Sequence, residues 1–214
     1  MKIDLFQIGN FHVHGYGFMI GIGFLLALAL GCMRAKKLGL KDESVIDIAI
    51  LAGVCGFLGA KLLYVIVSFK DFLKDPLAVL GSEGFVVYGG IIAGMLSGYF
   101  LCKWRKVHPL AMLDLASLGF LIGQGIGRWG NFVNQEAFGS NTNLPWGMYS
   151  QATYNYLSSV KSTLAAQGVT VDPSMPVHPC FLYESIWCLL GFLLLHIFSK
   201  KWKKYDGQIF LLYM

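Results

Sequence analysis

The stretch IGRWGNFVNQEAFG, residues 126–139, places polar and charged side chains at the end of an apolar run. Arg128, Asn131 and Gln135 recur at steps of three and four, so they share one face if a helix continues through them. The stretch also carries two further polar residues, Asn134 and Glu136. An arginine fork suits a phosphate, and an asparagine can bind glycerol hydroxyls. The pattern favours a site for a phosphate-bearing lipid, and the alternative is a purely structural polar network.

Two tyrosines lie beside glycines in other apolar runs. VHGYGFMIGIGF contains Tyr16, and FVVYGGIIAG places Tyr88 before Gly89 and Gly90. A single tyrosine near the end of a span is usually an interfacial anchor. Two of them beside glycines, at the depth expected for Arg128, favour a shared cavity. Four glycines keep the helix around Arg128 thin, so that another backbone or a substrate can come close: Gly123, Gly125, Gly127 and Gly130.

Three ionisable residues lie inside or at the edge of apolar runs. Lys61, in GAKLLYVIV, is costly at membrane depth and is therefore a functional candidate. It can snorkel towards the surface or pair structurally, or it can bind an anionic headgroup. Asp47 and Asp114 lie near the expected starts of helices, where a negative charge offsets the helix dipole.

The composition identifies the class of protein that must position these residues. Of 214 residues, 56% are hydrophobic and 14% are charged, whereas soluble domains carry about 25% charged residues. We predict an all-α polytopic membrane bundle that forms one integral membrane domain over residues 1–214. The five cysteines form no CxxC pair, so we expect neither a disulfide framework nor a metal site, and no cofactor.

Spanning helices need roughly 20 mostly apolar residues. Five segments satisfy this loosely: 14–33, 45–67, 84–102, 109–127 and 180–199. A sixth begins near Gly207 and reaches the last residue, Met214, too early to cross a bilayer. Lysine and arginine concentrate in three loops: 34–43, 103–108 and 200–206. These loops are expected to be cytoplasmic, so the net charge of +5 reports topology and not nucleic-acid binding.

This orientation places the N-terminus and the segment 131–178 outside the cytoplasm. We call 131–178 the cap segment. Its prolines and polar residues make it too polar to span. Within it, Tyr154, Leu157 and Val160 recur at helical steps, which predicts a short amphipathic helix. That helix either lies on the outer membrane face or packs within the cap.

The motifs resemble those of the bacterial prolipoprotein diacylglyceryl transferases. GRWGNFVNQEAFG is similar to the family pattern G-R-x-G-N-F-x-N-x-E-x-x-G. YGFMIGIGF resembles the Y-G motif of the first span, and GAKLLYV resembles G-x-R-L-x-Y-V, with Lys61 where arginine is usual. LPWGM and HPCFLYES resemble the L-P-W-G and H-P-x-x-L-Y-E motifs. The resemblance extends from about residue 10 to residue 214.

The resemblance implies transfer of a diacylglyceryl group from phosphatidylglycerol to the lipobox cysteine in the signal peptide of a prolipoprotein, at the bacterial cell membrane. A thioether forms and glycerol phosphate leaves. The implied partners are phosphatidylglycerol, the prolipoprotein and the lipid bilayer. The catalytic candidates are Arg128, Glu136, Tyr16 and Tyr88. The substrate-binding candidates are Arg128, Asn131, Asn134, Gly139, Gly89, Gly90 and Lys61.

The chain departs from the family pattern at two places. The family often has histidine in an H-G-G motif, where this chain has Tyr88. Tyr88 is either the base that deprotonates the thiol or a group that positions the headgroup. The family also has a seventh span with an arginine-containing run, and the sequence ends before such a run. Two alternatives follow: a lipid-binding relative without full activity, or a small transporter, which the absence of an internal repeat disfavours.

Overall fold

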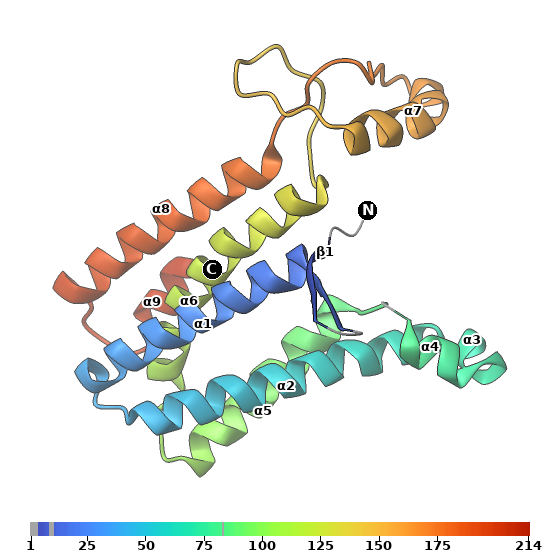
Figure 1. The fold of residues 1–214 in the computed structure, drawn as a ribbon. Helices are drawn as coiled ribbons and strands as arrows, with labels where there is room; N and C mark the ends of the chain where they lie inside the picture. Colours follow the sequence, from blue (N-terminus) through green and yellow to red (C-terminus); the bar gives the residue numbers. More distant parts are fainter. Residues whose placement is uncertain (1–3, 9–10, 83) are drawn as a thin grey trace. The chain divides into compact units, whose positions relative to one another are not determined.

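The computed structural model describes residues 4–8, 11–82 and 84–214 (Figure 1). The chain divides into two compact units. The first comprises Met1–Ala27, Leu118–Trp202 and Tyr213, and the second comprises Leu28–Ser117, Lys203–Leu212 and Met214. A single membrane domain over the whole chain stays a prediction.

The described part of the chain is predominantly helical, as predicted. The longer helices are α1 (Gly15–Ala35), α2 (Asp42–Val67), α5 (Val87–Trp104), α6 (Pro109–Asn134), α7 (Gln151–Ala166) and α8 (Cys180–Lys201). The shorter ones are the 3₁₀ turn η1 (Lys36–Leu38), α3 (Phe69–Lys74), α4 (Pro76–Gly81) and α9 (Gln208–Tyr213). Three elements were not predicted from the sequence: α3, α4 and the antiparallel ribbon of β1 (Asp4–Ile8) and β2 (Phe11–His14).

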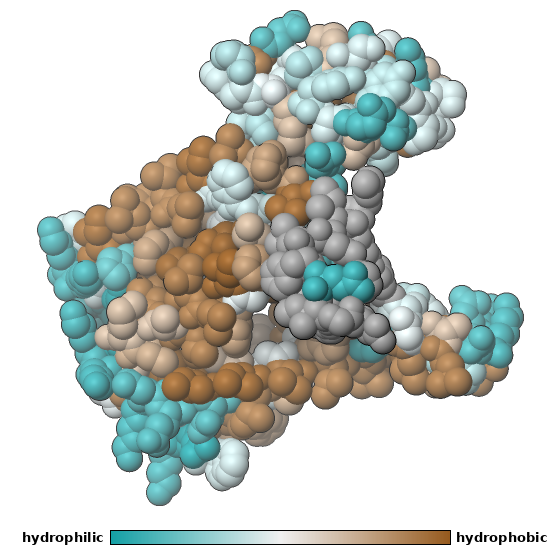
Figure 2. All heavy atoms as spheres, viewed as in Figure 1, coloured by the Kyte–Doolittle hydropathy of each residue, from teal (hydrophilic) through white to brown (hydrophobic). Residues whose placement is uncertain are grey.

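Among the described helices, four are long and apolar enough to cross a membrane: α1, α2, α6 and α8. The third expected span coincides with α5, whose 18 residues reach about 27 Å at 1.5 Å each. Glycine, serine and tyrosine lower the hydropathy of α5, and it is not among the four. Figure 2 shows apolar residues along α8, whereas the segment around α7 is mostly polar. The chain is a multi-pass membrane protein.

Small residues bring α6 close to its neighbours in the first unit. A Cβ added to Gly23 of α1 would lie 3.1 Å from the carbonyl oxygen of Gly123. A Cβ added to Gly125 would lie 3.1 Å from the side chain of Leu189 on α8. Close approach of backbones at small residues is the usual way in which membrane helices pack. The glycines of α6 therefore serve helix packing on two sides.

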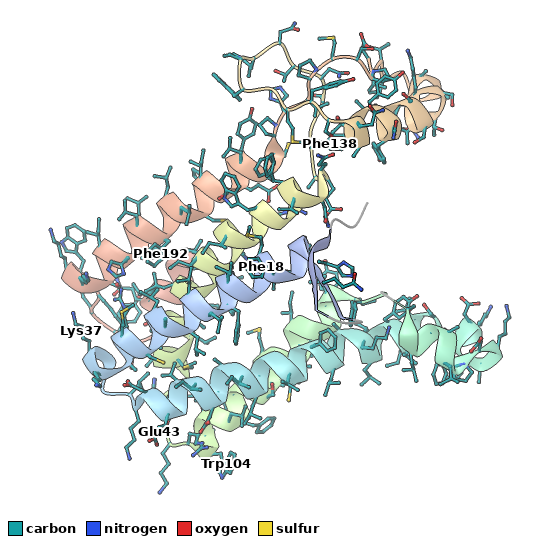
Figure 3. The ribbon with its side chains drawn as sticks, viewed as in Figure 1. Phe18, Lys37, Glu43, Trp104, Phe138 and Phe192 are labelled. Atoms are coloured by element: carbon teal, nitrogen blue, oxygen red, sulfur yellow. The ribbon has the colours of Figure 1, made fainter. Side chains whose placement is uncertain are left out.

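The cap segment contains the predicted helix as α7. Ser150 begins it with a capping box, in which Ser150 and Thr153 exchange hydrogen bonds. Thr153 and Leu157 are buried, and the ring of Tyr156 packs edge-on against Phe138, 5.6 Å away between centroids (Figure 3). These contacts show that part of α7 packs within the cap, which was one of the two alternatives for this helix.

In the second unit, α2 and α5 run side by side (Figure 1). Gly90 of α5 faces α2, since a Cβ added there would lie 3.2 Å from the carbonyl oxygen of Gly56. Gly89 is buried against Gly59 and Leu63. The apolar core of this unit gathers at the other end of these helices: Ala35, Val45, Ile48, Cys102, Val107, Met112 and Leu115.

Asp114 has a role that was not predicted. Its side chain is 3% exposed, and its carboxylate accepts backbone N–H groups of Gly207 and Phe210 at 2.9 and 3.0 Å. It therefore offsets the dipole of α9, and the predicted effect on its own helix stays a prediction. Asp114 also pairs with Lys203 at 2.9 Å.

Lys203 lies in the loop between α8 and α9. Burial opposes its charge, but hydrogen bonds to Asp206 and Asp114 outweigh burial, so the pKa of this ammonium is raised. A raised pKa means that the interaction stabilises the fold at neutral pH, and that this stabilisation is lost only as the pH rises past the raised value.

We predict that Asp114→Ala releases α9. Removing one partner of a buried ion pair costs about 3–5 kcal/mol, and the N–H groups of Gly207 and Phe210 lose their acceptor. Hydrogen exchange of the 207–213 amides should accelerate strongly. The control is Asp71→Ala, because the pair between Asp71 and Lys74 is exposed and is worth at most about 1 kcal/mol. Equal exchange in both variants would contradict the anchoring role.

Candidate active site

A tight turn ends α6 and shapes the candidate site. Gln135 has a left-handed backbone with φ of 54°. The N–H of Glu136 donates to the carbonyl of Asn131 at 2.9 Å, and that of Gln135 donates to Phe132 at 3.0 Å. This pair of bonds is a Schellman motif, which closes a helix end. The helix therefore does not continue through Gln135, so the expected shared face with Arg128 is wrong for this residue.

The same turn brings Glu136 back onto α6. One carboxylate oxygen of Glu136 accepts from the side-chain amides of Asn131 at 3.2 Å and Asn134 at 3.3 Å. The side-chain oxygen of Asn134 is buried and has no hydrogen-bond partner among the described residues. A buried acceptor without a partner is costly. The network can therefore still accept a hydrogen bond from a hydroxyl group.

Arg128 lies on the last turns of α6 and pairs with Glu184 of α8. The guanidinium and carboxylate are 2.5 Å apart, with side chains 41% and 47% exposed. Glu184 was not among the predicted site residues. The signal was present in the motif HPCFLYES, whose glutamate received no role. One cation and one carboxylate thus stand together beside the asparagine network.

Two further hydrogen bonds hold α8 against α6 at this level. The indole of Trp129 donates to the hydroxyl of Ser185 at 3.1 Å. That hydroxyl, which is buried, donates to the carbonyl of Gly125 at 2.7 Å. The rings of Trp129 and Phe181 pack edge-on at 5.6 Å. These contacts fix the helix that carries Glu184 independently of the ion pair.

Tyr16 and Gly139 also lie beside this network. A Cβ on Gly130 would come within 2.8 Å of the Tyr16 ring, so the tyrosine packs directly on the turn between Arg128 and Asn131. Gly139 donates its N–H to the carbonyl of His178 at 2.9 Å. A Cβ there would lie 2.9 Å from the sulfur of Cys180. Gly139 therefore permits the cap segment to cross the chain that enters α8.

The cap is joined to α8 by an aromatic cluster that was not predicted from the sequence. The hydroxyl of Tyr183 accepts from the indole of Trp146 at 2.9 Å and lies 3.0 Å from Nδ1 of His178. The cluster links LPWGM to HPCFLYES. These two motifs, far apart in the chain, are therefore in contact in the fold.

Lys61 contacts the segment that precedes α5. Its ammonium donates to the carbonyl of Ser82 at 2.6 Å, and to the Ser82 hydroxyl and the carbonyl of Gly84 at 3.3 Å. It also lies over the rings of Tyr64 and Phe85, at 5.2 and 4.9 Å. These contacts correspond to structural pairing, which was one of the two alternatives. A direct contact with a headgroup stays a prediction.

Tyr88 lies in the first turn of α5, the helix that this segment leads into. Its side chain is 73% exposed and so is open to a ligand. Gly89 and Gly90 contact α2, so packing accounts for both glycines, and their contact with substrate stays a prediction. Tyr16 and Arg128 belong to the other unit. The shared cavity expected for Tyr16, Tyr88 and Arg128 therefore also stays a prediction.

The five cysteines are free thiols. The described residues contain no group of three or more histidine, cysteine or acidic side chains that could hold a metal ion. The chemistry available at the end of α6 is therefore that of an arginine, two carboxylates, two carboxamides and a phenol.

The fold and the site together define the class of protein. It is a multi-pass helical membrane protein with a polar site at the end of a spanning helix. A family model described as prolipoprotein diacylglyceryl transferase matches residues 4–214. The chain belongs to this family.

Three relatives are named phosphatidylglycerol–prolipoprotein diacylglyceryl transferase. The protein of Clostridioides difficile strain 630 is 34% identical over 211 residues, which cover 98% of this chain and 76% of the relative. The protein of Finegoldia magna is 35% identical with the same coverage. The protein of Thermotoga maritima is 35% identical over 213 residues, covering 98% of this chain and 68% of the relative.

We predict that Lys61→Met destabilises the protein by about 1–3 kcal/mol, because the Ser82 carbonyl loses a charged donor. Thermal unfolding in detergent should show the loss. Lys61→Arg should retain most of the stability. Lys74→Met is the matched control, since the side chain of Lys74 is 79% exposed and its ammonium pairs with the exposed carboxylate of Asp71. Identical transitions for Lys61→Met and Lys74→Met would argue against the structural role.

Proposed function

We propose that this protein moves the diacylglyceryl group of phosphatidylglycerol onto the lipobox cysteine of a prolipoprotein. The cysteine thiolate attacks the carbon of the diacylglyceryl group that bears the phosphate. The bond between that carbon and the phosphate oxygen breaks, a thioether forms, and the phosphate leaves with the headgroup glycerol as glycerol phosphate. The observation that carries this proposal is the Arg128–Glu184 pair beside the network of Asn131, Asn134 and Glu136.

Arg128 is the proposed phosphate contact. The leaving group gains negative charge as the carbon–oxygen bond breaks, and a preorganised cation stabilises that charge. The planar guanidinium can donate two parallel hydrogen bonds to a phosphate. Its side chain is 41% exposed, so a lipid headgroup can reach it. The Tyr16 ring packs on the same turn of α6, and we assign its hydroxyl to the phosphate or to the glycerol beside it.

The asparagine network is the proposed site for the headgroup glycerol. Glycerol hydroxyls both donate and accept. The buried side-chain oxygen of Asn134 lacks a donor in the described chain, and a glycerol hydroxyl would supply one. Glu136 holds both asparagine amides and so fixes their orientation. Gly139 keeps the following segment close to α8, which supports the network from the cap side.

The remaining candidates lie in the second unit. We assign Lys61 to holding the segment before α5, because its three donors all reach that segment. Gly89 and Gly90 then place the first turn of α5 on α2. For Tyr88 we prefer positioning of the headgroup, because its exposed phenol can both donate and accept a hydrogen bond. Its alternative role is that of the base that accepts the thiol proton.

Arg128→Lys tests the assignment most directly. The lysine keeps the charge but loses the fork, so we expect transfer to a lipobox peptide to fall roughly 100-fold. Mass spectrometry of the peptide measures the added diacylglyceryl group. Arg105→Lys is the control, because Arg105 pairs with Asp47 in the second unit. Full activity of Arg128→Lys would remove the role, and no transfer by the unaltered protein would leave only a lipid-binding relative.

We also propose that the protein lies in the bacterial cytoplasmic membrane with its N-terminus and cap segment outside. The support is the distribution of lysine and arginine among the loops. In a cysteine-free background, Lys161→Cys should react with an impermeant thiol reagent added to intact cells, whereas Lys201→Cys should not. Both positions are exposed, so access is limited only by the membrane. The opposite labelling would invert the topology.

A further inference from the structure

A second polar cluster lies on α6 below the candidate site. Gln124 is an exposed residue inside this spanning helix. Its side-chain amide donates to the hydroxyl of Tyr213 at 3.2 Å. Its oxygen accepts from the thiol of Cys188 on α8, with 3.8 Å between sulfur and oxygen. Polar groups at membrane depth are costly and usually functional, and the proposed reaction has so far used none of these three.

The position of the cluster along the helices is defined by Arg128 and Glu184. Gln124 precedes Arg128 by four residues on α6, and Cys188 follows Glu184 by four on α8. Four residues of helix rise about 6 Å. Arg128 is nearer the end of α6 at Asn134, so Gln124 lies about 6 Å closer to the middle of the span.

The distance along α6 from Arg128 to Gln124 matches the distance from the phosphate of a phospholipid to the inner edge of its polar region. The polar layer on each side of the hydrocarbon core is about 5–8 Å thick. A lipid whose phosphate lies at Arg128 therefore has the inner edge of its polar region near Gln124. The groups at that edge are the two ester carbonyls that join the acyl chains to glycerol, and a carbonyl oxygen can only accept hydrogen bonds.

The cluster offers the complementary groups. A glutamine amide has two N–H donors, and Tyr213 takes one of them. The thiol of Cys188 donates to the amide oxygen of Gln124, and the Tyr213 hydroxyl keeps its own proton to donate. The cluster therefore has two donors left for an acceptor, the second N–H of Gln124 and the hydroxyl proton of Tyr213. The hydrocarbon region contains no water to supply one.

We propose that Gln124 and Tyr213 form a subsite that binds an ester carbonyl of the diacylglyceryl group. This inference rests on the proposed function, because it takes the phosphate to lie at Arg128. The subsite would hold the glycerol backbone at a second point, one helical turn below the phosphate. It would thereby select lipids whose chains are joined by esters over lipids whose chains are joined by ethers.

The test compares dialkanoyl phosphatidylglycerol with its dialkyl ether analogue, which lacks both carbonyls. Each lipid displaces a fluorescent phosphatidylglycerol from the protein in micelles, so the reading does not depend on turnover. One neutral hydrogen bond is worth about 0.5–1.5 kcal/mol, so the unaltered protein should prefer the ester roughly 2- to 12-fold. Gln124→Leu should abolish most of this preference.

The controls separate recognition from a merely structural role. Gln151→Leu changes an exposed glutamine of α7 that bonds Asn155, and the preference should persist. If Gln124→Leu does not insert, Tyr213→Phe decides the question, because its ring still packs near Phe120 while its proton is lost. This variant should lower the preference.

Equal affinities of the two lipids for the unaltered protein would overturn the subsite. A preference unchanged in Gln124→Leu, or in Tyr213→Phe where the first variant does not insert, would overturn it as well. Transfer to a lipobox peptide is scored separately with the ester lipid. Absence of transfer would count against the proposed function, while a binding preference that depends on Gln124 would still support the subsite.

Discussion

The close packing of α6 against α1 and α8 is the constraint on which the candidate site depends. Gly123 meets the backbone of α1, Gly125 meets Leu189, and Gly130 meets the Tyr16 ring. A methyl group at Gly125 or Gly130 would push its neighbour away by a fraction of an ångström or more. Because Arg128 lies between these glycines, its direction follows from the helix packing. Glu184 reaches Arg128 from α8, and the Tyr16 ring packs from α1 on Gly130 of the same turn.

The end of α6 supplies the second requirement. The left-handed residue Gln135 reverses the chain, so that Glu136 returns to Asn131 and Asn134 instead of continuing outward. The hydrogen bond from Gly139 to the chain before α8 then holds the start of the cap in place. A site built in this way has a rigid helix on one side and a braced loop on the other. This suits a reaction in which a headgroup must be held while its bond to the lipid breaks.

The sequence predicted the helices well because long apolar runs have few alternatives in a membrane. The hydrogen bonds of Glu136 with Asn131 and Asn134 join residues that are close along the chain, whereas the role of these residues and of Arg128 in a site stays a prediction. The sequence did not reveal Glu184 as the partner of Arg128, since that pairing depends on how α8 packs against α6. The prediction that Gln135 shares a helix face with Arg128 was wrong, because the position of a helix end depends on local backbone conformation, which the periodicity of the sequence does not report. The contacts of Lys61 likewise needed the fold of the segment before α5.

The Asp114–Lys203 pair and the Arg128–Glu184 pair differ in the exposure of their side chains. The side chains of Asp114 and Lys203 are 3% and 12% exposed, and breaking such a pair costs about 3–5 kcal/mol. The pair therefore stabilises the position of α9. Arg128 and Glu184 are 41% and 47% exposed, and pairs of this kind contribute at most about 1 kcal/mol. In the proposed reaction, the lipid phosphate therefore replaces Glu184 at Arg128 at small cost. Glu184 then holds Arg128 in position without competing strongly for it, and α8 stays in place through Trp129 and Ser185 while the exchange occurs.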